Sequence, residues 1–247
     1  MTQQYPQKSG IETIVKNAFS YWSKTLIYQI LFSLVYLSIF LSIAIYAMNH
    51  YGIIDDYMAL GEKLQVSQDA YLQGAQELAK KPEFQTFYFI MLGTMMFLYP
   101  LNMGFYKIYR KIDLGEKYDI SDLFAGYRGI NFFIYTSYYL FWMVVFSYTM
   151  QTIFLGIVWV FITLFSAPLM FFMNKTIFQS ISLNFKALKS HFLEIFVCFL
   201  VAVIFKYIGV ISIVGLVFTF PFVNAMIYAL YRNIFNEDRK KEKVKSL

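Results

Sequence analysis

The side chains with the greatest potential for chemistry are few and far apart in this chain. It has two histidines, His50 and His191, and one cysteine, Cys198. His191 and Glu194 stand three residues apart, a spacing that places both on one face of a helix and allows an imidazole–carboxylate pair. A zinc or iron site needs three or four such ligands converging on one point. The spacing predicts no such set, so we expect no metal centre and no cofactor.

Motifs for phosphate binding or nucleophilic catalysis are also missing from the sequence. It contains no G-x-x-x-x-G-K-[ST] phosphate loop and no G-x-S-x-G turn that would expose a serine nucleophile. Cys198 lies inside an apolar run, where a small buried side chain is its expected role. These residues therefore predict a protein that is not an enzyme.

The elements that would have to position any site are long apolar runs. Hydrophobic residues make up 59% of the 247 residues and charged residues 15%, whereas a soluble domain is about 25% charged. Six runs are long enough, at about 1.5 Å per residue, to cross most of a hydrocarbon core about 30 Å thick. They are residues 25–48, 84–106, 132–149, 152–173, 192–208 and 212–231. We therefore expect an all-α integral membrane protein with six transmembrane helices arranged as three hairpins.

Lysine and arginine are distributed unevenly between the connections. Seventeen of the 21 lie in the N-terminal segment, in the second and fourth connections, or from Arg232 onward. By the positive-inside rule, both termini should be cytoplasmic. Because the basic residues lie beside apolar runs, anionic lipid headgroups are the expected partner and nucleic acid is not. We expect one polytopic membrane domain over residues 1–235 and a basic cytoplasmic tail over residues 236–247.

The first connection, residues 49–83, is the longest and is net acidic. Leucine and alanine recur there at helical spacing, which predicts two short amphipathic helices lying over the bundle. Gly61 and Gly74 are expected to interrupt these helices. A cap, a linker and a ligand-binding lid all remain compatible with this pattern.

Two short motifs recur along the chain. Residues 102–110 and 224–232 both read Asn-x3-Tyr-x2-Tyr-Arg, and each follows a proline. A proline removes one backbone hydrogen bond and bends a helix, which a bundle tolerates when neighbours satisfy the freed carbonyl. We expect both asparagines to be buried and bonded to a neighbouring helix or a freed carbonyl. The structural or interaction candidates of these motifs are Pro100, Asn102, Arg110, Pro168, Pro221, Asn224 and Arg232.

The second motif precedes the odd-numbered runs. Phe19, Phe124 and Phe185 each stand a few residues before a lysine or arginine, at the end of a short amphipathic stretch. Such a stretch is suited to lie in the membrane interface, with its aromatic side chains at headgroup depth. Phe124 and Phe185 are therefore further interaction candidates. The pattern predicts three parallel repeats, each a short interfacial helix followed by a two-span hairpin.

Several segments carry a resemblance to a known family. They are residues 104–106, 115–117, 120–127, 180–186 and 221–231. Through them the chain resembles the bacterial six-span family catalogued as DUF975 and its relatives of the glycerophosphodiester phosphodiesterase membrane-domain type. The resemblance implies a cytoplasmic-membrane protein of undefined biochemical role, and it supplies no catalytic residues.

Two functions follow from these observations. The first is a non-enzymatic scaffold or accessory subunit of an envelope process, with another membrane protein as its partner. The second is a carrier or binder of a lipid-like or neutral small molecule, whose path would run between the hairpins near Pro100, Pro168 and Pro221. A cavity at these prolines would favour the carrier, whereas a filled bundle would favour the scaffold.

Overall fold

The computed structural model describes residues 10–245, with the side chains of all except Ile213 and residues 236–245. Within this range every regular element is an α-helix or a 3-10 helix. The side chains of the expected basic tail, residues 236–247, lie outside the described part. Contacts divide the chain into a larger unit, Met1–Ser33 with Pro100–Leu247, and a smaller unit, Leu34–Tyr99.

Five helical stretches are long and apolar enough to cross a membrane, and a sixth is added if a bent helix pair counts as one span. The five are Leu26–His50, Pro82–Leu114, Ile153–Met173, Ile177–Val210 and Val214–Phe235. Their apolar side chains are widely exposed, as Ile27 at 71% and Phe154 at 69% illustrate. Exposed apolar surface of this extent is suited to a lipid environment, and the described residues form an all-helical structure compatible with a multi-pass membrane protein.

A short helical segment precedes each odd-numbered apolar run, as the sequence predicted. Helix α1 (Ile11–Lys24) ends at Thr25, where α2 (Leu26–His50) begins. The 3-10 helix η2 (Ile120–Tyr127) is bent by 65° from α7 (Asn131–Thr149). Helix α10 (Ile177–Val210) contains one non-helical residue, His191, with φ −136° and ψ 29°. We call α1, η2 and the part of α10 before His191 the three elbows.

Each even-numbered apolar run is broken close to its proline. Helix α5 (Pro82–Leu98) is followed by the 3-10 turn η1 (Tyr99–Leu101) and by α6 (Asn102–Leu114). Helix α8 (Ile153–Thr163) gives way to α9 (Ser166–Met173), and α11 (Ile213–Thr219) gives way to α12 (Phe222–Lys245). The lost proline N–H accounts for these interruptions. We call them the first, second and third breaks.

Two hairpin turns agree with the sequence. Helices α7 and α8 are joined by residues 150–152, and α10 and α11 by residues 211–212. The second turn lies just after Gly209, where a Cβ atom would come within 1.8 Å of Thr219 Oγ1. Gly209 therefore permits α10 and α11 to approach closely.

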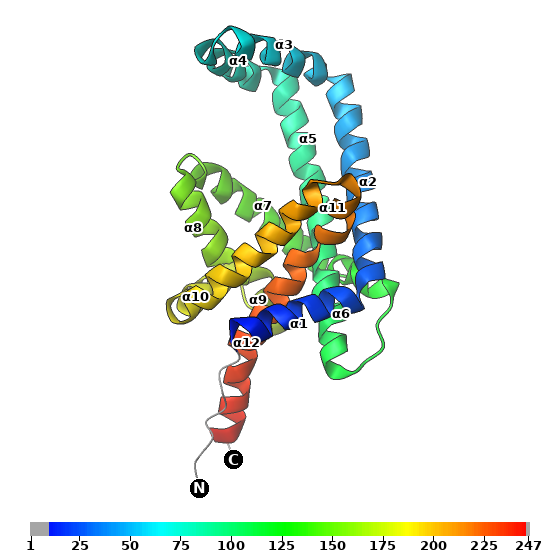
Figure 1. The fold of residues 1–247 in the computed structure, drawn as a ribbon, viewed down its shortest axis with the longest axis vertical. Helices are drawn as coiled ribbons and strands as arrows, with labels where there is room; N and C mark the ends of the chain where they lie inside the picture. Colours follow the sequence, from blue (N-terminus) through cyan, green and yellow to red (C-terminus); the bar gives the residue numbers. More distant parts are fainter. Residues whose placement is uncertain (1–9, 246–247) are drawn as a thin grey trace. The chain divides into compact units, whose positions relative to one another are not determined.

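The smaller unit contains two helices in the first connection, α3 (Ile53–Val66) and α4 (Gln68–Lys80), which lie side by side (Figure 1). The prediction of two helices is confirmed, but the prediction that Gly61 and Gly74 interrupt them is wrong. Both glycines lie within helices, and the chain breaks at Ser67, whose Oγ accepts a hydrogen bond from the Ala70 N–H at 3.0 Å. A local cap on α4 thus decides where the first helix ends.

Candidate functional site

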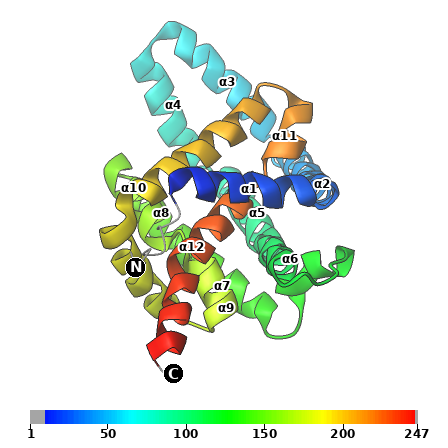
Figure 2. The same ribbon diagram turned by 60° about the horizontal axis from the view of Figure 1, so that its bottom comes forward.

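Each elbow in the larger unit contacts one of the three breaks. Helix α1 packs against α12, η2 packs against α6, and α10 packs against α9. Figure 2 shows α1 crossing the beginning of α12. An elbow therefore meets the break of the preceding hairpin, and the first elbow meets the break of the last hairpin. We call these contacts the α1, η2 and α10 junctions.

The α1 junction is held by an indole. Trp22 Nε1 donates a hydrogen bond to the carbonyl oxygen of Phe218, beside the third break, at 2.8 Å. The ring of Phe222, directly after Pro221, lies 4.7 Å from the ring of Phe19. Phe222 is fully buried, so the start of α12 is covered by the elbow.

The η2 junction depends on two glycines. A Cβ atom at Gly104 would come within 2.3 Å of Leu123 Cα, and one at Gly126 would come within 2.1 Å of the Pro100 carbonyl oxygen. Both obstacles are backbone atoms and cannot rotate away. Glycine is therefore required for η2 to reach the first break.

The α10 junction is held by a buried amide, Asn184. Its Oδ1 accepts a hydrogen bond from the Phe165 N–H at 2.8 Å, and its Nδ2 donates to Ser166 Oγ at 3.2 Å. Both partners lie at the second break, between α8 and α9. Asn184 is fully buried, so this side chain replaces hydrogen bonds that the interrupted helix lacks.

The two repeated asparagines bind each other. Asn224 Nδ2 on α12 donates to Asn102 Oδ1 on α6 at 2.9 Å. This confirms the prediction that each amide bonds to a neighbouring helix, but the expected burial holds only for Asn224, since Asn102 is partly exposed. Their identical settings after a proline therefore bring the starts of α6 and α12 together.

A cluster of four polar side chains joins α1, α6 and α12. Tyr21 Oη and Tyr228 Oη donate to the two carboxylate oxygens of Asp113, at 2.6 and 2.7 Å. Arg232 Nη1 donates to Tyr21 Oη at 2.6 Å and lies 3.0 Å from Asp113 Oδ1. We call Tyr21, Asp113, Tyr228 and Arg232 the Asp113 cluster.

The Asp113 cluster is shielded from water on most sides. The Asp113 side chain is 8% exposed and the Arg232 side chain 44% exposed. Burial, the hydrogen bond to Asp113 and the charge of Asp113 together raise the pKa of Tyr21. Tyr21 therefore stays neutral and keeps its role as hydrogen-bond donor to the carboxylate.

A second layer of polar contacts extends the cluster towards α2. Gln29 Nε2 donates to Tyr109 Oη at 2.8 Å and to Thr25 Oγ1 at 3.0 Å. The Tyr109 ring lies 5.3 Å from the ring of Tyr21 and 5.5 Å from that of Tyr228. These distances are typical of packed aromatic pairs, so the end of the bundle at the cluster is filled by three tyrosine rings.

Helical spacing explains how the sequence builds this cluster. Tyr106, Tyr109 and Asp113 follow one another at three and four residues, and Tyr228 and Arg232 at four, so each set shares a helix face. On α1 the buried residues Ile14, Ala18 and Tyr21 form the equivalent stripe. Three amphipathic stripes therefore converge on one carboxylate.

A second carboxylate is neutralised by two lysines. Asp122 is 2% exposed, and its oxygens lie 2.8 Å from Lys107 Nζ and 2.7 Å from Lys111 Nζ. The same side chain accepts the Asp119 N–H in a capping box that begins η2. The neighbouring Asp119 has a lowered pKa, because Ser121 donates hydrogen bonds to its carboxylate. Lys107 and Lys111, which are among the basic residues that indicate the orientation, thus also pair with Asp122.

The remaining predicted residues have different settings. Pro100, Pro168 and Pro221 are all buried. Phe124 is 44% and Phe185 50% exposed, with Lys189 Nζ 4.6 Å from the Phe185 ring. Arg110 is half-buried and forms no ion pair with another described residue. The two arginines of the repeated motif therefore have different surroundings, since only Arg232 meets Asp113.

Sequence reasoning did not single out Tyr21, Asp113, Asp122 and Asn184 as site residues. Asp113 and Asp122 lie in a connection that was judged by its basic residues alone. A carboxylate four residues after Tyr109 was a usable signal, because that spacing places it on the buried face of α6. The partners of Tyr21 and Asn184 are distant in the chain and could not be predicted from spacing.

The ionisable groups of these contacts have the following settings. Among the described residues, no group of three or more His, Cys, Asp or Glu side chains could hold a metal ion. His191 Nδ1 lies 3.9 Å from Glu194 Oε1, the predicted pair, at the kink of α10. The carboxylates of Asp113 and Asp122 are both engaged by cations and hydrogen-bond donors.

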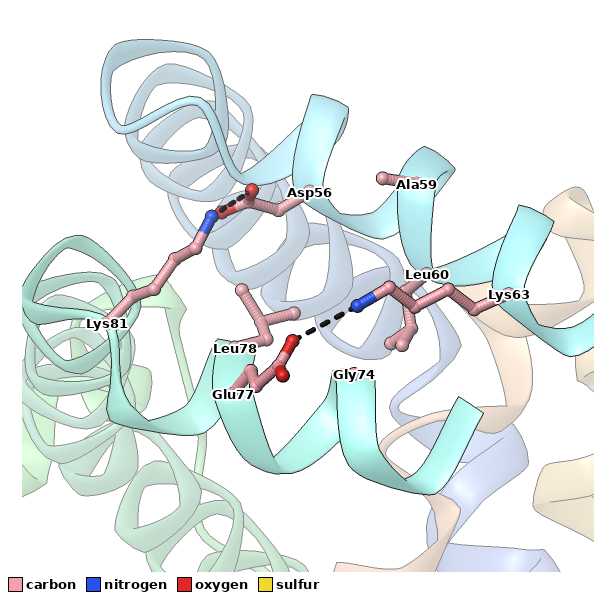
Figure 3. A pocket seen from close by; sticks show the side chains of 8 residues that line it. All are labelled: Asp56, Ala59, Leu60, Lys63, Gly74, Glu77, Leu78 and Lys81. Atoms are coloured by element: carbon pink, nitrogen blue, oxygen red, sulfur yellow. Dashed lines mark hydrogen bonds and ion pairs between the residues drawn. The ribbon is translucent and has the colours of Figure 1, made fainter. Parts of the chain in front are cut away.

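In the smaller unit, a cavity of about 120 Å³ lies between α3 and α4 (Figure 3). Two ion pairs line it: Lys81 Nζ with Asp56 Oδ1 at 2.5 Å, and Lys63 Nζ with Glu77 Oε2 at 3.1 Å. Ligand pockets usually measure about 300–1,000 Å³, so this space is too small for such a ligand.

Comparisons with models of protein families, with curated proteins and with solved structures found no match to this chain. Its function therefore has to be argued from its own residues.

Proposed function

We propose that this protein is a non-enzymatic scaffold or accessory subunit in the cytoplasmic membrane of a bacterium, acting with another membrane protein. The observation that carries this proposal is the Asp113 cluster. Its charged and phenolic groups are used to hold α1, α6 and α12 together, which is what a rigid binding platform requires.

The surroundings of Pro100 and Pro221 also favour a scaffold over a carrier, whereas a cavity lined by Met170 of α9 lies close to Pro168 in the sequence. All three are buried, and at Pro100 the backbone of Gly126 lies too close for even one additional carbon atom. The Tyr21, Tyr109 and Tyr228 rings fill the space between α1, α6 and α12. A translocation path at Pro100 or between α1, α6 and α12 would have to displace packed backbone and buried aromatic rings.

The proposed topology has six spans in three hairpins, with the three elbows on the cytoplasmic face. It places both termini in the cytoplasm. A cysteine introduced at Gln68 in α4 should react with an impermeant maleimide in intact spheroplasts, and one at Ser246 should not. Both experiments use a background in which Cys198 is replaced by Ala. Labelling at Ser246 and protection at Gln68 would contradict the topology.

Co-purification tests the scaffold role. The full chain should be extracted in mild detergent after in-cell crosslinking and analysed by native mass spectrometry. We expect a second membrane protein in fixed stoichiometry that survives exchange into a different detergent. Recovery of the chain alone, together with uptake of a solute by vesicles that contain it, would overturn the proposal in favour of a carrier.

A further inference from the structure

A cavity of about 900 Å³ opens at the α10 junction, between α7, α9 and the beginning of α10. Pockets that bind small molecules usually measure about 300–1,000 Å³. It is lined by residues of α7 and α9, of the connection between α9 and α10, and of the beginning of α10. We call it the α7–α9–α10 pocket.

Part of the pocket lining is polar and positively charged. Asn131, the first residue of α7, lies there, with Asn174, Lys175 and Thr176 from the connection between α9 and α10. Lys175 is the single charged residue among those that line the pocket, and it forms no ion pair with another described residue. The positive ends of α7 and α10 add to its field. An anion would therefore be attracted to the part of the pocket near Lys175.

Much of the remaining lining is apolar, and its phenylalanines are exposed. Phe133 on α7 is 64% exposed and Phe178 on α10 is 74% exposed, and Phe171 and Met170 of α9 continue the wall. Exposed phenylalanines at the boundary between a charged connection and apolar helices are positioned for acyl chains. Exposure of these apolar side chains to water would cost free energy.

We propose that the α7–α9–α10 pocket binds an anionic phospholipid from the surrounding leaflet. The phosphate lies at Lys175, with Asn131 and Thr176 as hydrogen-bonding neighbours, and an acyl chain follows Phe133 and Phe178. The cavity combines a positive charge with apolar surface. Free phosphate would make no use of the apolar surface. A neutral lipid would leave the charge of Lys175 uncompensated. The inference is independent of the scaffold role, because a structural lipid site serves either function.

The test measures lipid retention by the full chain in mild detergent with native mass spectrometry. The probes are phosphatidylglycerol and phosphatidylcholine of the same acyl composition. Lys175→Gln removes the charge, and Ser137→Trp fills the cavity from α7, where Ser137 is exposed to it. Lys186→Gln is the matched control, since Lys186 is exposed on the same elbow but does not line the pocket.

We expect the parent and Lys186→Gln to retain phosphatidylglycerol in preference to phosphatidylcholine. One lysine near an anionic headgroup changes affinity by about five-fold, so Lys175→Gln should lower the retention of phosphatidylglycerol by about that factor. Ser137→Trp should lower the retention of both lipids. A melting temperature equal to that of the parent in the absence of lipid identifies variants that fold normally.

Three results would overturn the proposal. Equal loss in Lys186→Gln and Lys175→Gln would show a diffuse surface attraction. Unchanged retention in a folded Ser137→Trp variant would place the lipid elsewhere. Displacement of bound lipid by glycerol 3-phosphate as efficiently as by phosphatidylglycerol would assign the site to a soluble phosphate. None of these results bears on the presence of a protein partner, so the two proposals fail separately.

Discussion

Two sites in the larger unit use similar residues in opposite ways. Around Asp113, the cation of Arg232 meets a carboxylate and the tyrosine rings close the space. Around Lys175, no carboxylate lines the cavity, and phenylalanine side chains remain exposed. A basic residue and an aromatic residue beside a helix break thus form a structural contact in one place and an open pocket in the other. The deciding difference is the presence of Asp113.

The largest expected effect comes from the backbone contact at the η2 junction. Gly126→Ala would force a Cβ atom against the Pro100 carbonyl, and overpacking of this kind costs about 1–3 kcal/mol or more. The melting temperature in detergent should fall sharply. Gly61→Ala is the control, because nothing lies within 4 Å of its added carbon in α3; it should match or exceed the stability of the parent. A Gly126→Ala variant as stable as the parent would show that η2 does not depend on this close approach.

Removal of the Asp113 charge should have the second-largest effect on stability. Asp113→Asn keeps the shape of the side chain but leaves Arg232 without its carboxylate and weakens both tyrosine hydrogen bonds. Because Arg232 is 44% exposed, water screens part of the loss, and we expect about 2 kcal/mol of destabilisation. Lys175→Gln should change stability by less than about 0.5 kcal/mol, since that lysine forms no ion pair with any side chain that the structure describes. Equal effects of the two substitutions, measured by thermal unfolding, would remove the distinction between the Asp113 and Lys175 sites.

Substitution of Asn102 and Asn224 should have a smaller effect on stability, and the two effects should be coupled. Asn102→Leu and Asn224→Leu should each lower the melting temperature while expression persists, because each leaves one amide without its partner. Hydrogen bonds between membrane helices average about 0.6 kcal/mol and reach about 1.7 kcal/mol. A double-mutant cycle should therefore show a coupling within that range. A coupling of zero would mean that the bond does not stabilise the packing of α6 and α12.

Alkaline titration should give the smallest change. The pKa of Tyr21 is raised in the folded protein, so its hydrogen bond to Asp113 is fully formed below the ordinary tyrosine pKa of about 10. As the pH rises beyond that value, the unfolded chain releases the proton first and the stabilising contribution declines. The difference in melting temperature between the parent and Tyr21→Phe should be constant from about pH 7 to 9 and shrink above about pH 10. A difference that grows with pH would contradict the donor role of Tyr21.

Local pattern by itself determined the class of this protein and the positions of its main helices. The apolar runs predicted membrane-spanning helices, Pro100, Pro168 and Pro221 predicted the breaks, and the amphipathic stretches predicted the elbows. These features depend on residues near one another in the chain, through helical periodicity and the missing proline N–H. The repeated Asn-x3-Tyr-x2-Tyr-Arg motif also indicated two amides that bond between helices.

Only the tertiary structure decided which elements meet. The deciding contacts join residues that are far apart in the chain. Asn102 binds Asn224, and Asn184 holds the second break. Asp113 is bound by Tyr21, Tyr228 and Arg232. Spacing places a side chain on a helix face but does not say which neighbour that face will contact. The same limit explains why Arg110 and Arg232, equal in the sequence motif, differ in the fold. A charge is either paired or left free for a ligand according to whether packing brings it an opposite charge.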